Sequence, residues 1–335
     1  MKKKVKIIAE AGANHNGEIE IAKKLIEVAK NSGADIVKFQ TSIPKLHISK
    51  NAFAANYQSK SLKLGETNLE MHEKISLPLE DFKKLKSYAE NLNIDFLSTP
   101  FDHVSIDYLV EIGLQCFKIP SGEITNLPYL RKIGSLNKEI IISTGMANIS
   151  EIRDALNILT FSGTKKDKIT IMHCNTEYPT PFIDVNLYAM QQLKNEFKLD
   201  VGYSDHTIGI EVPIAAVALG AKIIEKHITL DRNLPGPDQS SSLEPNELKN
   251  MIVAIRNIEN SLGDGFKKAT LSEKKNIPVA RKSIVAKNKI IKGEIYNENN
   301  LTVKRPGTGI SPMKWDSLIG KKSNKNYDED DLIEL

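Results

Sequence analysis

The strongest constraint on the fold is a regular alternation of short apolar segments with amphipathic helical segments over about the first 260 residues. The apolar segments are rich in β-branched residues, which is typical of strands. Helical patterns such as IEIAKKLIEVAKNSG and LEDFKKLKSYAENLN separate them. Eight segments are predicted as strands: residues 6–10, 35–39, 95–100, 115–120, 139–144, 168–174, 199–204 and 221–227.

Eight nearly continuous apolar strands with intervening helices predict an α/β fold, a closed (β/α)8 TIM barrel. An open doubly wound sheet is the alternative. That fold often has a Gly-rich dinucleotide fingerprint after its first strand, whereas here the first strand runs into EAGANHNGE. Polar residues also end all eight strands instead of gathering at one switch point. The sequence therefore favours the barrel.

Changes in composition predict the domain boundaries. Residues 1–263 form the barrel, the Lys-rich and weakly patterned residues 264–282 form a linker, and residues 283–335 form a small, mostly β domain. At roughly fifty residues that domain is marginal by itself and is expected to dock on another surface. A long insertion at residues 41–78 follows the second strand, and it is predicted to be a lid or a dimer contact.

Composition limits the partners and the compartment. The formal net charge of +4 is spread along the chain, so it does not indicate nucleic acid or membrane as a partner. Cys116 and Cys174 lie separately in apolar segments, which fits reduced thiols. The apolar run near the N-terminus is too short for a signal sequence or a membrane span. A cytoplasmic location is expected.

Polar side chains stand at the ends of the predicted strands, where a barrel gathers its catalytic groups. Each one alone has an ordinary explanation as a solvated strand end. Their recurrence after all eight strands predicts one site at the barrel mouth. In chain order they are Glu10, Lys38, Gln40, Thr99, Lys118, Ser121, Glu123, Ser143, His173, Ser204, His206 and His227.

Two histidines after neighbouring strands suggest a metal site. His206 follows the seventh strand and His227 ends the eighth, so their imidazoles are predicted to converge on one divalent ion. Hydrogen-bonded structural histidines are the alternative. Two nitrogen ligands leave positions open for water and substrate, which is typical of a catalytic metal.

Two lysines lie inside apolar strands, where an unpaired ammonium group is costly to bury. Lys38 and Lys118 therefore need anionic partners. Structural carboxylates are the ordinary partners, but hydroxyls at the same mouth also suit a phosphate and a carboxylate carried by a substrate. A Schiff-base lysine is the competing chemical role.

Taken together, the motifs resemble the sialic acid synthase family, which includes N-acetylneuraminate, legionaminate and pseudaminate synthases. The resemblance covers nearly the whole chain in collinear order. It rests on IIAEAGANHNG, DIVKFQT, FLSTPFD, FKIPSGE, ISTGMAN, HCNTEYPTP, VGYSDHT, EKHITLD, GPDQSSSLEP and VKRPG. The resemblance implies a barrel followed by a small antifreeze-like (SAF) domain.

The resemblance also implies a reaction. Family members condense phosphoenolpyruvate with an open-chain N-acylated hexosamine, typically N-acetylmannosamine, and release phosphate by C–O cleavage. A 2,4-diacetamido-2,4,6-trideoxymannose acceptor, which makes a legionaminate synthase, is the alternative. The implied cofactor is a divalent metal held by His206 and His227, usually Mn2+, with Mg2+ or Co2+ possible.

Site residues follow from the motifs by resemblance. Glu10 matches a carboxylate near the reacting carbons. The implied phosphoenolpyruvate contacts are Lys38, Thr99, Lys118, Ser121, Ser143, Thr176 and Ser204. The implied acceptor contacts are Gln40, Glu123, Tyr178, Asp238 and Arg305. Two positions depart from the pattern: Thr176 stands where some members have Asn, and Gln239 stands where many have His.

The resemblance implies a domain-swapped homodimer, in which Arg305 of the VKRPG motif acts in trans at the partner's barrel mouth. From composition alone, Arg305 would be a surface residue on a turn. Two other functions compete with the synthase. One is a noncatalytic sugar-binding barrel, which would not need a metal and two lysines that face anions. The other is a Schiff-base aldolase that acts through Lys38 or Lys118.

Overall fold

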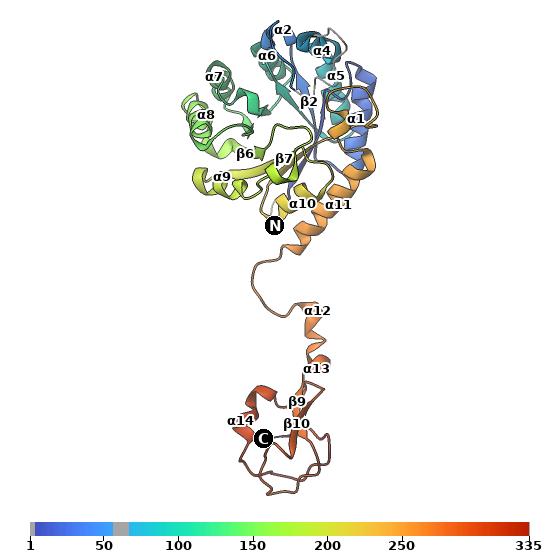
Figure 1. Ribbon diagram of the computed structural model, residues 1–335, viewed down its shortest axis with the longest axis vertical. Coiled ribbons are helices and arrows are strands. Elements are labelled where there is room, and N and C mark those ends of the chain that lie inside the picture. The colour runs from blue at the N-terminus through green and yellow to red at the C-terminus, as the bar shows by residue number, and fades with distance from the viewer. Residues whose placement is uncertain (1–3, 56–66, 335) are drawn as a thin grey trace. The chain divides into compact units, whose positions relative to one another are not determined.

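A computed structural model describes residues 4–55 and 67–334 and confirms the barrel (Figure 1). Within these residues one sheet has eight strands, all joined in parallel in the order β3-β2-β1-β8-β7-β6-β5-β4. The end strands β3 and β4 contact each other, so the sheet is a nearly closed barrel. The strands are β1 (Lys6–Gly12), β2 (Ile36–Thr41), β3 (Asp95–Pro100), β4 (Cys116–Ile119), β5 (Glu139–Ser143), β6 (Ile169–Cys174), β7 (Asp200–Asp205) and β8 (Ile223–His227).

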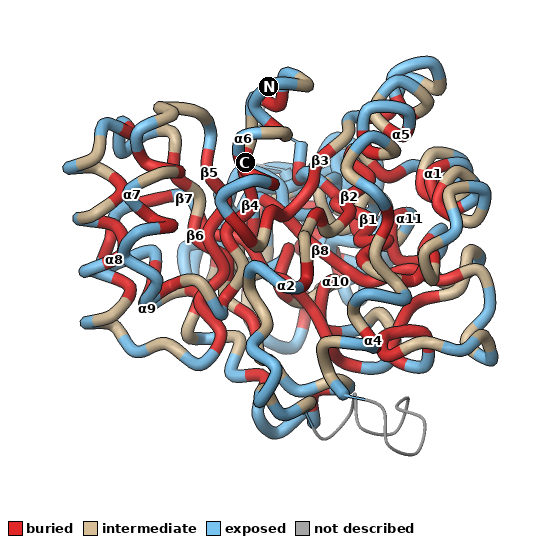
Figure 2. The backbone as a smooth tube through the Cα atoms, turned by 90° about the horizontal axis from the view of Figure 1, so that it is seen from above, coloured by how far each residue is buried: buried red, intermediate tan, exposed pale blue. Residues whose placement is uncertain are grey.

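Helices follow the strands and cover the outside of the barrel. Figure 2 shows largely buried strands surrounded by helices that expose part of their surface. Local signals set several helix ends: the Asn148 side chain accepts from the N–H groups of Ser150 and Glu151 at the start of α8. The covering helices are α1 (Ile19–Ser32), α5 (Leu79–Asn91), α6 (His103–Glu111), α7 (Leu127–Ser135), α8 (Ile149–Phe161), α9 (Ala189–Phe197), α10 (Glu211–Ala218) and α11 (Pro245–Ser261).

In its described residues, the predicted insertion at 41–78 contains the helices α2 (Pro44–His47) and α4 (Asn68–Ile75). Its residues 56–66 lie outside the described residues. A capping box starts α4: Thr67 accepts from the N–H of Glu70, whose carboxylate accepts from the N–H of Thr67.

The chain divides into two compact units, Met1–Leu262 and Gly263–Leu335. The residues predicted as a linker lie within the second unit and form the short helices α12 (Leu271–Lys274) and α13 (Ile277–Ala280). The antiparallel strands β9 (Ser283–Ala286) and β10 (Leu301–Lys304) follow, and then the short helix α14 (Trp315–Leu318). A separate hydrophobic core holds this unit together: Ile284, Ala286, Ile290, Tyr296, Leu301, Leu318, Tyr327 and Ile333.

Candidate active site

The pleat of the strands builds the site on an apolar floor. Side chains two residues apart on a strand point to the same face. An apolar cluster fills the barrel interior, formed by Ile8, Ile36, Leu97, Ile141, Met172 and Ile223. Two residues further along these strands come Glu10, Lys38, Thr99, Ser143, Cys174 and Glu225. The floor therefore gives way to a predominantly polar layer at the carboxyl ends of the strands.

A network of buried ion pairs occupies this layer. Lys38 Nζ lies 2.9 Å from a Glu10 carboxylate oxygen and donates to Thr99 Oγ1 at 3.0 Å. Lys118 Nζ donates to Glu225 Oε1 at 3.2 Å, and the hydroxyl of Ser204 donates to the same oxygen at 3.2 Å.

Lys38 and Lys118 thus meet at one carboxylate, because Lys38 Nζ is also 3.6 Å from Glu225 Oε1. The structure brings together the two predicted lysines and shows that carboxylates of this chain pair with them. This pairing is the ordinary explanation for buried lysines, and it holds both lysines at the barrel mouth.

Glu225 was missed in the sequence analysis, which took only His227 from the EKH segment. A signal was present, because residues two apart on a strand share a face and His227 had already been assigned to the interior. Glu225 Oε2 is buried and has no hydrogen-bond partner among the described residues.

The network of ion pairs shifts the pKa values of its two carboxyl groups, Glu10 and Glu225, in opposite directions. Burial raises the pKa of Glu10, although Lys38 opposes that shift. Burial acts on Glu225 in the same direction, but Lys118 and Lys38 outweigh it and lower the pKa of Glu225 to about 2. Burial alone would lower the pKa of Lys38, yet Glu10 and Glu225 raise it. Glu225 therefore stays ionised, whereas Glu10 takes up a proton more readily than Glu225 does.

The two predicted metal-binding histidines lie side by side, with ring centroids 5.5 Å apart. The Tyr178 ring packs against both imidazoles. Its centroid lies 4.0 Å from that of His206 and 5.6 Å from that of His227. Asn175 fixes the His206 ring, whose Nδ1 lies 2.5 Å from the Asn175 carbonyl oxygen. The other nitrogen of His206, Nε2, is left for a ligand.

The donor chemistry fits a divalent transition metal. Burial lowers the pKa of His206 to about 4 and that of His227 well below its usual range, so both imidazoles are neutral near pH 7. His227 Nδ1 is buried without a hydrogen bond in the described part of the chain, and Asp238 Oδ2 lies 3.7 Å away.

Over residues 4–55 and 67–334, no group of three or more His, Cys, Asp or Glu side chains is arranged to hold a metal. A metal here would therefore bind two histidine nitrogens and take its other ligands from water or substrate.

A buried ion pair lies directly behind the histidines, on the outer face of the strands. Lys226 Nζ is 2.5 Å from Asp205 Oδ2, and neither side chain is exposed. Lys226 also donates to the Thr207 carbonyl oxygen, and Asp205 Oδ1 accepts from the Thr207 N–H at 3.1 Å. Asp205 precedes His206 and Lys226 precedes His227. The pair therefore joins the two strand ends that present the histidines.

Three of the predicted hydroxyl contacts, Ser121, Ser143 and Thr176, lie on the β4–β6 side of the mouth. Ser121 Oγ accepts from the Gly145 N–H at 2.9 Å, and Ser143 Oγ is buried without a partner in the described residues. A Cβ added to Gly145 would lie 2.7 Å from Thr176 Cγ2 and 2.8 Å from Ser121 Oγ. Glycine at 145 thus lets the chain pass close to both side chains.

The predicted acceptor contacts are more scattered. Gln40 Nε2 donates to Glu10 Oε1 at 3.2 Å, which places it beside the Lys38–Glu10 pair. Glu123 is half-buried, and its carboxylate accepts from Asn126 at 2.5 Å. Burial raises the pKa of Asp238 to about 7, with a further contribution from Glu10.

Arg305 lies in the second unit, where its Nε donates to the Ala280 carbonyl oxygen at 3.1 Å. Its action in trans stays a prediction.

One sequence expectation needs correction. His173 does not face the mouth: its Nε2 bonds the Val185 carbonyl oxygen at 2.8 Å, and its ring packs on Tyr203 outside the barrel. Met172 belongs to the interior cluster, and the next residue on a strand points to the opposite face.

Gln239, which departs from the family pattern, is buried and hydrogen-bonded within the chain. Its amide donates to the Asn14 carbonyl oxygen at 3.0 Å, and its carbonyl accepts from Thr229.

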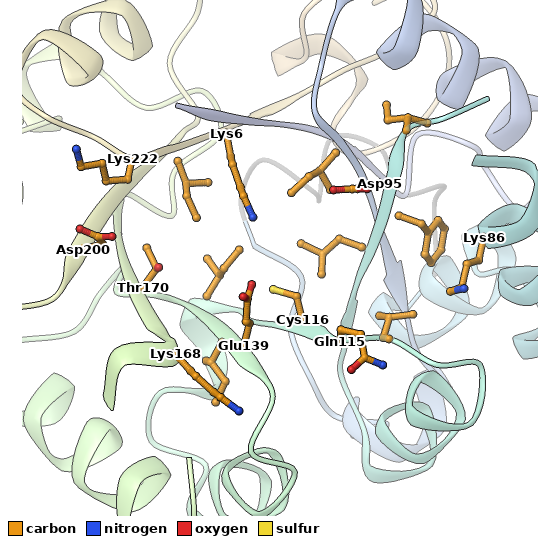
Figure 3. A pocket seen from close by; sticks show the side chains of 18 of the residues that line it. Lys6, Lys86, Asp95, Gln115, Cys116, Glu139, Lys168, Thr170, Asp200 and Lys222 are labelled. Carbon is orange, nitrogen blue, oxygen red and sulfur yellow. The ribbon is translucent and has the colours of Figure 1, made fainter. Parts of the chain in front are cut away.

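A cavity of about 1120 Å³ opens at the other end of the barrel, among the starts of the strands. Figure 3 shows Lys6, Cys116 and Glu139 among its lining side chains. Its lining residues include none of the predicted site residues. In barrels of this kind catalytic groups sit at the carboxyl ends of the strands, so this cavity is not the candidate active site.

No helix within the described ranges is long and apolar enough to span a bilayer.

Comparisons with known proteins agree with this fold. The NeuB family model matches residues 25–267, and the SAF domain model matches residues 281–334. The N,N'-diacetyllegionaminic acid synthase of Campylobacter jejuni is 59% identical over 331 residues, 99% of both chains. The enzyme of the same name from Legionella pneumophila is 44% identical over 96% of this chain and 90% of its own.

A solved structure is also similar, that of the N-acetylneuraminic acid (sialic acid) synthetase of Leptospira borgpetersenii in complex with citrate. It is 35% identical, with a TM-score of 0.70, and the match covers 82% of this chain and 90% of that one. The family match over most of the barrel and the near full-length relatives lead to one conclusion: the chain belongs to the NeuB family.

Proposed function

We propose that the protein is a nonulosonic acid synthase that condenses phosphoenolpyruvate with open-chain 2,4-diacetamido-2,4,6-trideoxymannose. The products are N,N'-diacetyllegionaminate and phosphate. The observation that carries the proposal is the buried pair of lysines, Lys38 and Lys118, beside serine and threonine hydroxyls at the barrel mouth. Identities of 59% and 44% to two N,N'-diacetyllegionaminic acid synthases favour this acceptor over N-acetylmannosamine.

The anionic substrate is assigned to the lysine side of the mouth. Lys38 and Lys118 balance its phosphate and carboxylate, while Thr99, Ser121, Ser143, Thr176 and Ser204 supply short-range contacts. Ser143 is well suited because its buried hydroxyl has no partner within the described residues. Glu225 pairs with both lysines before the substrate arrives.

The acceptor sugar is assigned to the part of the barrel mouth that faces the phosphoenolpyruvate across Lys38 and Lys118. Tyr178 and Asp238 flank the histidines, whereas Gln40 and Glu123 lie towards β2 and β4. A divalent ion on His206 and His227, most simply Mn2+ with Mg2+ or Co2+ as substitutes, would polarise the acceptor aldehyde.

The chemical steps conserve atoms. The methylene carbon of phosphoenolpyruvate forms a bond to the aldehyde carbon, water adds to the adjacent carbon, and collapse of that centre breaks the C–O bond and releases phosphate. Glu10 lies 2.9 Å from Lys38 Nζ and has a raised pKa. Glu10 is therefore the group assigned to hand a proton to the new hydroxyl or take one from the water.

A Schiff-base aldolase fits the geometry less well. A lysine nucleophile must be neutral, whereas Glu10 and Glu225 raise the pKa of Lys38. Lys118 is held in an ion pair, with its Nζ 3.2 Å from the Glu225 carboxylate.

Two further features belong to the proposal. The enzyme acts as a domain-swapped homodimer in which Arg305 completes the partner's acceptor site. Its compartment is the cytoplasm, consistent with two free cysteines.

The test is phosphate release from phosphoenolpyruvate by metal-stripped protein, with and without Mn2+, using each of the two acceptor sugars. Release that depends on Mn2+ and is faster with the diacetamido sugar is expected. Bridging 18O in phosphoenolpyruvate should appear in the phosphate, because C–O cleavage leaves that oxygen on phosphorus. A reaction without acceptor is the control. Equal turnover without metal, or no release with either sugar, contradicts the proposal.

A further inference from the structure

A second hollow, of about 470 Å³, opens beside the candidate active site. Its walls come from the segments that follow β2, β3 and β4, so it lies at the carboxyl end of the barrel. Its lining residues are Leu46, His47, Phe101, Asp102, His103, Val104, Glu123, Asn126 and Tyr129. Glu123 ends the turn that begins at Ser121, and so connects the hollow to the catalytic layer.

The hollow lies across the barrel from the histidines. His206 follows β7 and His227 ends β8, and β4 is four places from β8 in either direction around the sheet. An acceptor whose aldehyde end meets the histidines and whose chain crosses the mouth towards Glu123 therefore points its far end at this hollow.

The hollow combines an apolar wall with a buried polar atom that no described residue hydrogen-bonds. Leu46 and Val104 are 55% and 46% exposed although both are large apolar residues, and Phe101 continues the surface between them. His47 Nε2 is buried and has no hydrogen-bond partner in the described residues. The His47 ring lies 5.4 Å from the Phe101 ring.

Asp102 and Tyr129, two of the other polar residues of the lining, are already engaged. Asp102 accepts from the N–H groups of Ser105 and Ile43, both at 2.8 Å, and Tyr129 donates to the Pro100 carbonyl oxygen at 2.8 Å. The contact with Ile43 also fixes the start of the insertion, because Ile43 is the N-cap of α2, the helix that carries Leu46 and His47.

We infer that this hollow is the specificity pocket for the far end of the acceptor, and that it selects a sugar with a terminal methyl group and a second acetamido group. The inference rests on the proposed function. Leu46, Phe101 and Val104 contact the methyl groups, and His47 Nε2 hydrogen-bonds the acetamido group. N-acetylmannosamine instead places hydroxyls there, and a hydroxyl against an apolar wall lacks a partner. The first part of the insertion thereby forms one wall of the active site.

The test compares both acceptors with wild type and with variants that make the wall polar, Val104→Ser and Leu46→Ser. Each should raise KM for the diacetamido sugar about tenfold and lower KM for N-acetylmannosamine, whose hydroxyls gain a polar neighbour, while KM for phosphoenolpyruvate stays nearly unchanged. His47→Phe keeps an aromatic ring but removes the polar atom, and should likewise raise KM for the diacetamido sugar. Val253→Ser is the matched control, because Val253 is 52% exposed on α11 and does not line the hollow.

The outcomes separate the two proposals. Wild-type protein that releases no phosphate with either sugar overturns the proposed function and this inference with it. An active enzyme whose sugar preference is the same in wild type, Val104→Ser, Leu46→Ser and His47→Phe overturns the pocket alone. Wild-type preference for N-acetylmannosamine also overturns the pocket while leaving the condensation reaction in place.

Discussion

At the residue scale, the site depends on charges that balance inside the protein before any substrate binds. Lys38 and Lys118 are opposed by Glu10 and Glu225, and all four side chains are buried. Removing one partner of a buried pair leaves a charge without compensation, which typically costs about 3–5 kcal/mol. Phosphoenolpyruvate brings negative charge, so it can replace a missing carboxylate.

Glu225→Gln is therefore expected to lower the thermal stability of the free protein. It is also expected to increase the stabilisation that phosphoenolpyruvate provides on binding. The midpoint of thermal unfolding should fall, and saturating phosphoenolpyruvate without acceptor should raise it by more degrees in the variant than in wild type. Glu123→Gln is the control, because Glu123 is a carboxylate at the same mouth that pairs with Asn126 and with no lysine of the described residues. Equal shifts in wild type and Glu225→Gln would show that Glu225 does not occupy the anion site.

At the element scale, two adjacent strand ends must be held in register to bring His206 and His227 together. The buried ion pair of Asp205 and Lys226 joins these strand ends on the outer face of the barrel. Lys226 Nζ lies 2.5 Å from Asp205 Oδ2, and neither side chain is exposed to solvent. Neither residue touches the site directly, because residues on either side of a histidine in a strand point to the other face. Both are positioning residues.

Lys226→Met should weaken Mn2+ binding about tenfold or more, measured by titration calorimetry without substrates, because residues behind metal ligands typically contribute that much. It should also destabilise the barrel by about 3 kcal/mol in urea unfolding. Arg256→Met provides the comparison, since Arg256 pairs with Asp35 at 2.8 Å at the other end of the barrel. Arg256→Met should reduce stability and leave Mn2+ affinity unchanged; an unchanged affinity in Lys226→Met would refute the positioning role.

At the scale of the whole molecule, the chain has two separately packed units, and the proposed acceptor contact Arg305 belongs to the second. A residue that acts in trans has a consequence that a residue acting in cis does not. In a mixed dimer, the subunit that lacks the arginine supplies an intact barrel, and the subunit with a defective barrel supplies the arginine. One complete site can then form.

Arg305→Ala should raise KM for the acceptor and leave Mn2+ affinity unchanged. When Arg305→Ala and His206→Ala subunits are unfolded and refolded together, up to one site in each mixed dimer should regain wild-type KM. Each variant refolded alone is the control. Absence of recovery, with mixed dimers verified by mass, would exclude the arrangement in trans.

The sequence by itself determined the barrel, because eight apolar strands with intervening helices have few ways to bury both faces of a parallel sheet. It also identified the residue types at the mouth, including Glu10, Lys38 and the two histidines, because the end of a strand can be read locally. The interior position of Glu225 was equally readable from its spacing to His227, and was overlooked.

The tertiary structure decided which groups meet. Lys118 and Glu225 are 107 positions apart in the chain, and barrel closure and strand register, not local sequence, bring them to 3.2 Å. The pleat of the strand points His173 away from the barrel interior, where it contacts the Val185 carbonyl oxygen. Gln239 is buried and donates a hydrogen bond to the Asn14 carbonyl oxygen in another loop. The hollow beside Glu123 likewise exists only because three separate strand ends place their loops together. Such contacts depend on distances across the folded chain, and the local pattern of residue types carries no information about them.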